Sequence, residues 1–132
     1  MTHAQPTTGN VIRDAVNKAR EARKNNSSEG RKDDSSKPKV VRGFFEYFPN
    51  AIAEVARVSE FGAIKYDWGN WQFVNDGVNR YTEALGRHLL SEEAIDAESG
   101  LQHAAHAAWN AMARLELILR EMKNDSISTI DP

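Results

Sequence analysis

The residues best suited to chemistry cluster in the second half of the sequence. A short stretch there contains two carboxylates, two imidazoles and one carboxamide: Asp96, Glu98, His103, His106 and Asn110. Each residue of an α-helix advances by about 100°, so His103, His106 and Asn110 would lie within about 60° of one another on one face. Carboxylates and neutral imidazoles bind divalent cations such as manganese, cobalt and zinc, whereas magnesium prefers the acids. The spacing allows a metal site, but it equally suits histidines in a core or interface and acids that only favour the helix start.

The local sequence also predicts where this helix begins. Ser99 and Gln102 match a capping box, in which two side chains bond free N–H groups of the first turn. A helix that starts at Gly100 would place Asp96 and Glu98 just before its first turn. These acids would then approach the row of polar side chains from one end.

Two further acids belong to an earlier helix, which the apolar spacing predicts over residues 49–63. Its first residue, Pro49, suits a first helical turn. Glu54, Arg57 and Glu60 stand three residues apart on the other side of this helix. They form either an exposed ion-paired row, worth about 0.2–0.5 kcal/mol per pair, or a row whose glutamates complete a metal site.

Residues 65–71 form a predicted loop rich in aromatic, amide and cationic side chains. Lys65 would meet a phosphate, and the tryptophans would either stack on a base or fill the core. The next predicted helix, over residues 75–90, carries Arg80 and Arg87 on one face. This pair forms either a clamp for a polyphosphate or part of a solvated face.

The composition narrows the classes of protein. The chain has 132 residues, a formal net charge of -2 and no cysteine. We therefore expect one domain at most, no general binding to nucleic acid polymers, and neither disulfides nor thiolate chemistry. No apolar run approaches the ~20 residues that span a bilayer, and the polar N-terminus lacks a signal-peptide core. We expect a soluble, cytoplasmic protein without a membrane segment.

Three regions differ in composition. Residues 1–38 are typical of a polar arm and linker, with a short helix predicted over residues 10–24. Residues 39–123 contain the predicted core helices, and the aromatic residues at positions 44–48 are expected to enter the core. Residues 124–132 are expected to form a flexible tail.

The last predicted helix, over residues 100–123, becomes apolar on more than one side toward its end. No strand-like alternation is evident, so the sequence predicts an all-α fold, a small helical bundle. A core of this size cannot cover such a helix on all sides. We therefore expect a homo-oligomer, either a homodimer or a homotetramer.

Four short motifs, taken in order, point to a known family. They are Gly62-Ala63-x-Lys65-Tyr66, Asn70-Trp71, Arg87-His88-Leu89, and Asp96-x-Glu98-Ser99-Gly100-Leu101-x-His103-x-x-His106. Over about residues 40–120 this series resembles the phage and bacterial dATP/dGTP diphosphohydrolase family. That family includes the MazZ enzymes of phages that replace adenine with 2-aminoadenine, and it is distantly related to the all-α MazG-like pyrophosphohydrolases, which are oligomers that use divalent metal.

The resemblance implies hydrolysis of a purine deoxynucleoside triphosphate, dGTP and possibly dATP, to the monophosphate and pyrophosphate. It implies a divalent metal (Mg, Mn or Co) held among Glu54, Glu60, Asp96, Glu98, His103 and His106. Glu60 and Glu98 are the candidate catalytic carboxylates that would orient the water. The candidate substrate-binding residues are Lys65, Tyr66, Asn70, Trp71, Arg80, Arg87 and Asn110.

The sequence departs from the MazG pattern in one informative way. His103 and His106 stand where the second pair of acids is usual, so the metal ligands would be redistributed.

Two other classes of protein fit the same residues. A purine nucleotide sensor would bind without turnover, and an oligomeric helical adaptor would use the aromatic loop and the N-terminal arm for protein contacts.

Overall fold

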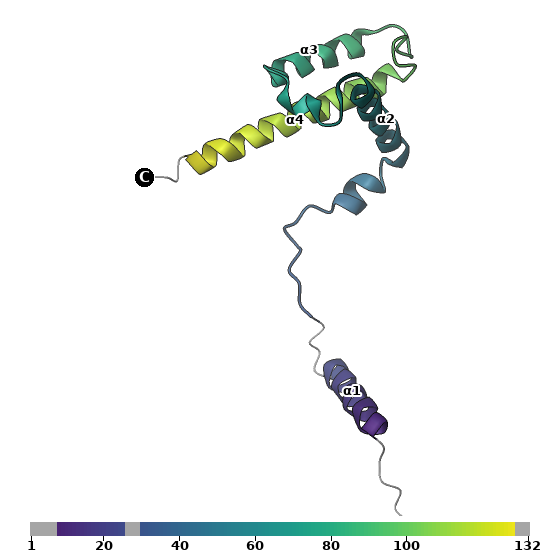
Figure 1. Cartoon of the computed structure of the whole chain (residues 1–132), viewed down its shortest axis with the longest axis vertical. Coiled ribbons are helices and arrows are strands. Elements are labelled where there is room, and N and C mark those ends of the chain that lie inside the picture. The colour runs from purple at the N-terminus through teal and green to yellow at the C-terminus, as the bar shows by residue number, and fades with distance from the viewer. Residues whose placement is uncertain (1–7, 26–29, 129–132) are drawn as a thin grey trace, which may run out of the picture. The chain divides into compact units, whose positions relative to one another are not determined.

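A computed structural model describes residues 8–25 and 30–128, and the chain divides into two compact units, residues 1–38 and 39–132. The first unit contains the helix α1, Thr8–Asn25 (Figure 1). This confirms the helix predicted over residues 10–24. Its apolar side chains, including Val11 and Ile12, are exposed within the unit. Residues 30–38 form no helix, as the linker composition predicts; residues 26–29 lie outside the described part of the chain.

All regular elements in the described part of the second unit are helical. They are a π-helical turn (Val41–Phe45), α2 (Pro49–Tyr66), the 3₁₀ turn η2 (Asn70–Phe73), α3 (Gly77–Leu90) and α4 (His103–Ser128). The described residues contain no strand and a single isolated bridge, between Ile95 and Gln102. The predicted all-α fold class is therefore confirmed. None of the described helices is both long and apolar enough to cross a membrane.

The ends of α2 follow from its sequence. Pro49 lies in the first turn, where a missing N–H costs nothing because that group has no partner inside the helix. The helix ends when Asp67 takes a left-handed backbone conformation (φ 73°), and Gly69 follows in another (φ 79°). These two reversals turn the chain directly into η2. As a result Lys65 and Tyr66 belong to the last turn of α2 rather than to the predicted loop.

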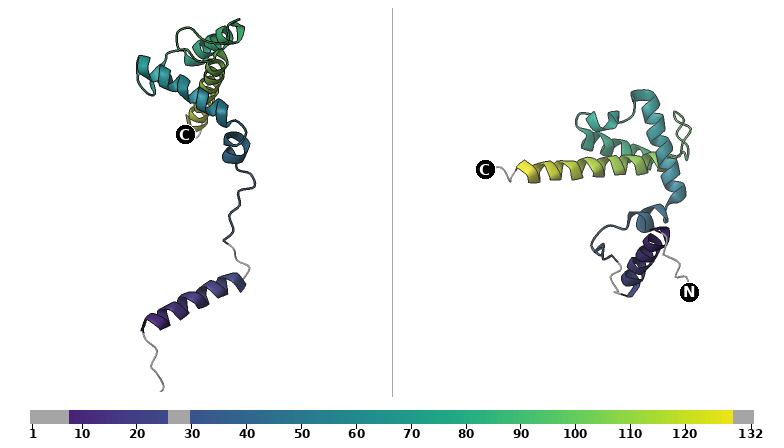
Figure 2. Two further views of the ribbon diagram at one scale, coloured as in Figure 1. Left: turned by 90° about the vertical axis from the view of Figure 1, so that its right-hand side faces the viewer. Right: turned by 60° about the horizontal axis from the view of Figure 1, so that its bottom comes forward.

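The core of the second unit forms where α4 packs along α3 and against α2 (Figure 2). The buried apolar residues are small: Val58 from α2, and Ala105, Ala107 and Ala113 from α4. Small side chains let helix backbones approach closely, and Gly77 marks one such point, since a Cβ there would lie 2.8 Å from Leu117 Cδ1. No described side chain is completely buried. The apolar core of one chain is therefore small.

The aromatic residues before α2 do not enter the core. Phe45, Tyr47 and Phe48 are each about half exposed or more. They pack on one another instead, with ring centroids of Phe44 and Phe48, and of Tyr47 and Phe48, 6.0 Å apart. The core-entry prediction was wrong because this segment precedes α2 and meets mainly its own neighbours.

The start and end of α4 also differ from expectation. The helix begins at His103, and Ser99 does not cap it. The chain forms a tight loop over residues 96–102 instead, closed by hydrogen bonds from Asp96 N to Leu101 O (2.8 Å) and from Gly100 N to Asp96 O (2.8 Å). At the other end the helix continues to Ser128. Part of the predicted tail is thus helical, and residues 129–132 lie outside the described part.

Beyond its contacts with α2 and α3, the second half of α4 keeps large apolar side chains exposed. Leu115, Leu119 and Met122 are examples. This agrees with the apolar excess seen in the sequence. The homo-oligomer remains a prediction.

One hydrogen bond joins α2 to α4 and gives a test of this packing. Trp109 Nε1 donates to Ser59 Oγ at 2.7 Å. Replacing Trp109 with Phe keeps a ring but removes this donor, so we expect the free energy of unfolding to fall by about 1–2 kcal/mol. Trp68→Phe is the matched control, because Trp68 is 74% exposed, and its effect should stay within about 0.5 kcal/mol. Denaturant unfolding measures both; equal losses in the two variants would contradict this role of Trp109.

Candidate functional site

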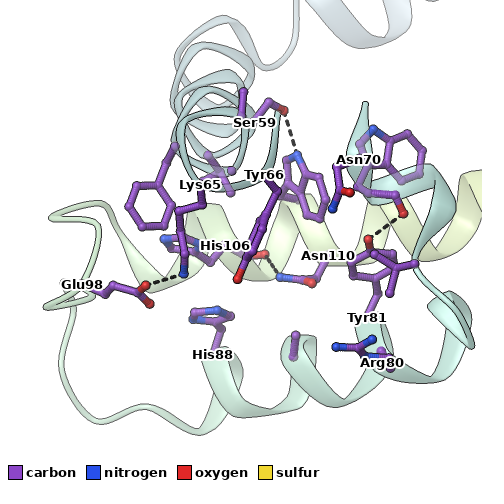
Figure 3. Close-up of a pocket in the computed structure, with 18 of the residues that line it drawn as sticks. Ser59, Lys65, Tyr66, Asn70, Arg80, Tyr81, His88, Glu98, His106 and Asn110 are labelled. Atoms are coloured by element: carbon purple, nitrogen blue, oxygen red, sulfur yellow. Dashed lines mark hydrogen bonds and ion pairs between the residues drawn. The ribbon is translucent and has the colours of Figure 1, made fainter. Parts of the chain in front are cut away.

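A cavity of about 570 Å³ lies in the second unit, between α2, η2, α3, α4 and the loop before α4 (Figure 3). All the residues predicted to bind substrate line it: Lys65, Tyr66, Asn70, Trp71, Arg80, Arg87 and Asn110. Of the predicted metal ligands, Asp96, Glu98 and His106 line the cavity, whereas Glu54, Glu60 and His103 do not. Of the two predicted catalytic carboxylates, Glu98 lines the cavity and Glu60 does not.

Helical spacing brings these side chains to one space. On α3, Arg80 and Arg87 stand seven residues apart, two turns along the same face. On α4, His106 and Asn110 stand four residues apart and are both buried. Of the predicted row of His103, His106 and Asn110, the last two therefore meet the cavity, and His103 does not line it.

The loop before α4 is held to that helix through Ser99. Its hydroxyl lies 2.7 Å from Asp96 Oδ2 and 2.7 Å from His106 Nε2, and its backbone N–H also donates to Asp96. A carboxylate only accepts, so the Ser99 proton points to Asp96 and His106 Nε2–H donates to Ser99 Oγ. The hydrogen bond from the Ser99 hydroxyl is the main reason that the pKa of Asp96 lies below its usual range. Asp96 is thus held ionised.

Three imidazoles, those of His88, His103 and His106, lie together beside this loop. The ring of His88 lies parallel to that of His106, with centroids 4.6 Å apart. His88 Nδ1 and His103 Nδ1 lie 2.8 Å apart, so one of these nitrogens donates and the other accepts. Burial is the main cause that lowers the pKa of both His88 and His106; the Asp96 carboxylate opposes this shift, and neighbouring imidazoles add to it. The stacked pair of His88 and His106 is therefore neutral near pH 7.

A cation and an acid meet across one end of the cavity. Lys65 Nζ lies 2.5 Å from Glu98 Oε1, and the ammonium also lies over the rings of Phe61 and Tyr66, at 5.5 and 5.3 Å from their centroids. The hydrogen bond to Glu98 raises the pKa of Lys65. Both side chains are partly exposed, so this pair adds little stability and is easily exchanged for another partner.

The opposite part of the cavity is aromatic. Trp109 meets Trp71 and Tyr81 edge to face, with centroids 6.0 and 5.6 Å apart, and Tyr81 Oη donates to Trp71 O at 2.7 Å. Burial raises the pKa of Tyr81 and keeps its phenol neutral. From α4, Arg120 lies over the Trp71 ring at 5.4 Å and donates to Gln72 Oε1 at 2.6 Å. Trp71 in this wall is therefore held by Tyr81 and Trp109 and by Arg120.

The predicted set of six metal ligands does not come together within one chain. The described residues contain no group of three or more histidines and acids that would hold a metal ion. Glu54 pairs with Arg57 at 2.8 Å, Glu60 is exposed on α2, and His103 is bonded to His88. The cavity itself offers Asp96, Glu98 and His106. Two carboxylates are too few for an all-protein cage, but they suit a cation that keeps other ligands from water and phosphate.

The sequence analysis did not predict the roles of two residues, His88 in the cavity wall and Ser99 beside it. His88 lies in the Arg87-His88-Leu89 motif, but nothing in that motif predicts that it stacks on His106. Ser99 was interpreted as a helix cap, whereas it bridges Asp96 and His106. The sequence feature that could have indicated this role is the position of Ser99 directly after Asp96 and Glu98.

Comparison with known proteins gives the family of the chain. Residues 27–127 match the family model described as dATP/dGTP diphosphohydrolase, N-terminal. The chain belongs to the dATP/dGTP diphosphohydrolase family. The matched residues include every residue that lines the cavity. No solved structure matches the chain.

One curated relative is a "dATP/dGTP diphosphohydrolase" of Salmonella phage PMBT28. It is 43% identical over 67 residues, which are 48% of this chain and 22% of the relative. The chain thus matches about a fifth of the length of that dATP/dGTP diphosphohydrolase.

The buried imidazoles predict how stability depends on pH. The pKa values of His88 and His106 lie below the ordinary 6.5 in the folded chain, so the unfolded chain binds more protons as the pH falls through about 6.5. The free energy of unfolding should therefore decrease from pH 7.5 to pH 5.5. Denaturant midpoints at the two pH values measure this, and His106→Gln should reduce the decrease. Glu116→Gln, on the surface of α4, should leave it unchanged; an unchanged decrease in His106→Gln would exclude His106 as a source.

Proposed function

We propose that this chain is a pyrophosphohydrolase that converts a purine deoxynucleoside triphosphate, dGTP or dATP, to the monophosphate and pyrophosphate. One observation carries the proposal: all seven predicted substrate-binding residues line one cavity, together with the carboxylates of Asp96 and Glu98. Membership of the dATP/dGTP diphosphohydrolase family supports it. The phage relative is named for the same substrates.

The charges of the cavity suit a triphosphate. Lys65 and Arg87 line the cavity together with Asp96 and Glu98 of the acidic loop, residues 96–102. Guanidinium and ammonium groups form strong, charge-assisted bonds with phosphate oxygens. The acidic partner of Lys65 is Glu98, whose side chain is 64% exposed. A triphosphate that bound Lys65 would therefore release the Glu98 carboxylate.

The released carboxylate supplies the base. In the proposed reaction a water oxygen attacks the α-phosphorus, and the bond from that phosphorus to the oxygen bridging the β-phosphate breaks. Pyrophosphate leaves with this oxygen and its electron pair, and the water proton passes to Glu98. Glu60, the other sequence candidate, lies outside the cavity, so we place this role on Glu98.

We propose that a divalent cation (Mg, Mn or Co) is needed and that it enters with the triphosphate. Magnesium in nucleotide sites is held by one or two carboxylates plus substrate phosphates, and Asp96 meets that requirement while Glu98 stays free to act as the base. The cation would neutralise phosphate charge. Asp96 is suited to it because Ser99 keeps its carboxylate ionised. Ligand roles for Glu54, Glu60, His103 and His106 stay predictions.

The wider setting is part of the proposal. The exposed apolar side chains of α4 support a homodimer or homotetramer. In a MazZ-like role the enzyme would supply dGMP for 2-aminoadenine nucleotide synthesis, in the cytoplasm where deoxynucleotides are made.

The first experiment tests the reaction itself. The full chain is incubated with each of the common NTPs and dNTPs and with magnesium, manganese or cobalt, and the products are separated chromatographically. We expect a purine monophosphate and pyrophosphate in equal amounts, and no product in the presence of EDTA. Release of orthophosphate would contradict cleavage at the α-phosphate. Nucleotide binding without turnover would identify a sensor, and no binding would favour an adaptor.

Arg87 provides a sharper test of the phosphate site. Because charge-assisted hydrogen bonds contribute about 1.5–3 kcal/mol, Arg87→Ala should lower kcat/KM for dGTP by about 10- to 100-fold. Arg57→Ala is the matched control, since Arg57 lies on α2 outside the cavity and pairs with Glu54. Its kcat/KM should stay within about twofold of the parent chain. Steady-state kinetics that show equal losses in both variants would remove Arg87 from the phosphate site.

A further inference from the structure

The cavity contains a side-chain amide whose orientation is fixed. Asn110 is 6% exposed, and its Nδ2 donates to the carbonyl oxygen of His106 at 2.8 Å. A carbonyl oxygen only accepts hydrogen bonds, so the NH₂ group must face His106 and the Oδ1 atom must face away. Figure 3 shows this bond within the cavity. The amide is thereby held as an acceptor.

The acceptor is open to the cavity. Among the described residues, nothing donates a hydrogen bond to Asn110 Oδ1. The described part of the chain also has no side-chain oxygen that is both fully covered and without a partner. Asn110 Oδ1 must therefore reach the space that it lines. Leaving a carbonyl-type acceptor without a partner when a ligand fills this space would cost stability of the complex.

The position of Asn110 shows which part of a ligand it would meet. It lies one helical turn beyond His106, which contacts the acidic loop, and next to Trp109, which belongs to the aromatic wall. A bound nucleotide would put its phosphates beside the cations near the acidic loop and its base against the aromatic rings. The open Oδ1 would then face an edge of the base.

We propose that Asn110 selects the base by accepting a hydrogen bond from an N–H donor on the purine edge. The ligand class is a purine with a ring N–H or an exocyclic amino group, as in guanine or adenine. An unsubstituted purine offers no donor and would leave Oδ1 without a partner. This inference rests on the proposed function and names how that site recognises its substrate. A merely structural role, a bond back to the preceding turn, uses only the NH₂ group and would not discriminate among bases.

The test compares substrates that differ in this donor. We expect kcat/KM for dGTP or dATP to exceed that for the triphosphate of deoxyribosylpurine, which lacks exocyclic groups, by about 10- to 100-fold. Asn110→Ala and Asn110→Leu both remove the acceptor, and Leu also keeps the volume of the side chain. In both variants the ratio of these two kcat/KM values should fall to within about threefold of one. The fall should come from a lower kcat/KM for dGTP or dATP.

Asn79→Ala is the matched control, because Asn79 is an exposed asparagine on α3 that bonds Asp76 and does not line the cavity. It should keep the discrimination of the parent chain. An unchanged ratio in both Asn110 variants, or no discrimination in the parent chain, would overturn the inference.

A binding measurement separates this inference from the proposed function. Equilibrium binding of dGMP and of deoxyribosylpurine monophosphate is measured with the parent chain and both Asn110 variants, where no turnover is needed. If the parent chain hydrolyses nothing, the proposed function fails. Tighter binding of dGMP that is lost in both Asn110 variants would still support the acceptor role, and equal binding of the two monophosphates by the parent chain would refute it.

Discussion

The hydroxyl of Ser99 is the link on which the arrangement of the cavity depends. It bonds Asp96 on one side and His106 on the other, and so fixes the loop over residues 96–102 against the first turns of α4. Without that link the two acids would stand on an exposed connection between helices. With it, Asp96 is held ionised in the cavity and Glu98 reaches Lys65 across its end. The proposed chemistry needs both positions.

The same link shapes the electrostatics of α4. A buried imidazole that donates to a serine oxygen stays neutral without leaving its N–H unsatisfied. His106 is in this state, and the ring of His88 stacks on it. The cavity therefore combines neutral aromatic and imidazole surfaces with a few separated charges. A nucleotide has the same division, with an uncharged base and a charged phosphate chain.

Much of this arrangement followed from periodic patterns in the sequence. Helical spacing predicted where the main helices lie. It also predicted the shared face of His106 and Asn110, because positions four apart lie above one another in any α-helix. The patterns failed where tertiary contacts decide. Ser99 matched a helix cap by local rules, but its hydroxyl found better partners in Asp96 and His106. Periodicity alone also left Glu60 as a site candidate, since it does not tell which side of a helix faces a cavity.

The brace formed by Arg120 has a practical consequence. All the family motifs lie between residues 62 and 106, which suggests that this stretch alone makes the site. The Arg120 guanidinium nevertheless lies against Trp71 and Gln72, from the second half of α4. A shortened chain that ended soon after the last motif would keep every motif and lose the outer support of the aromatic wall. A unit that keeps this support of the aromatic wall therefore includes Arg120.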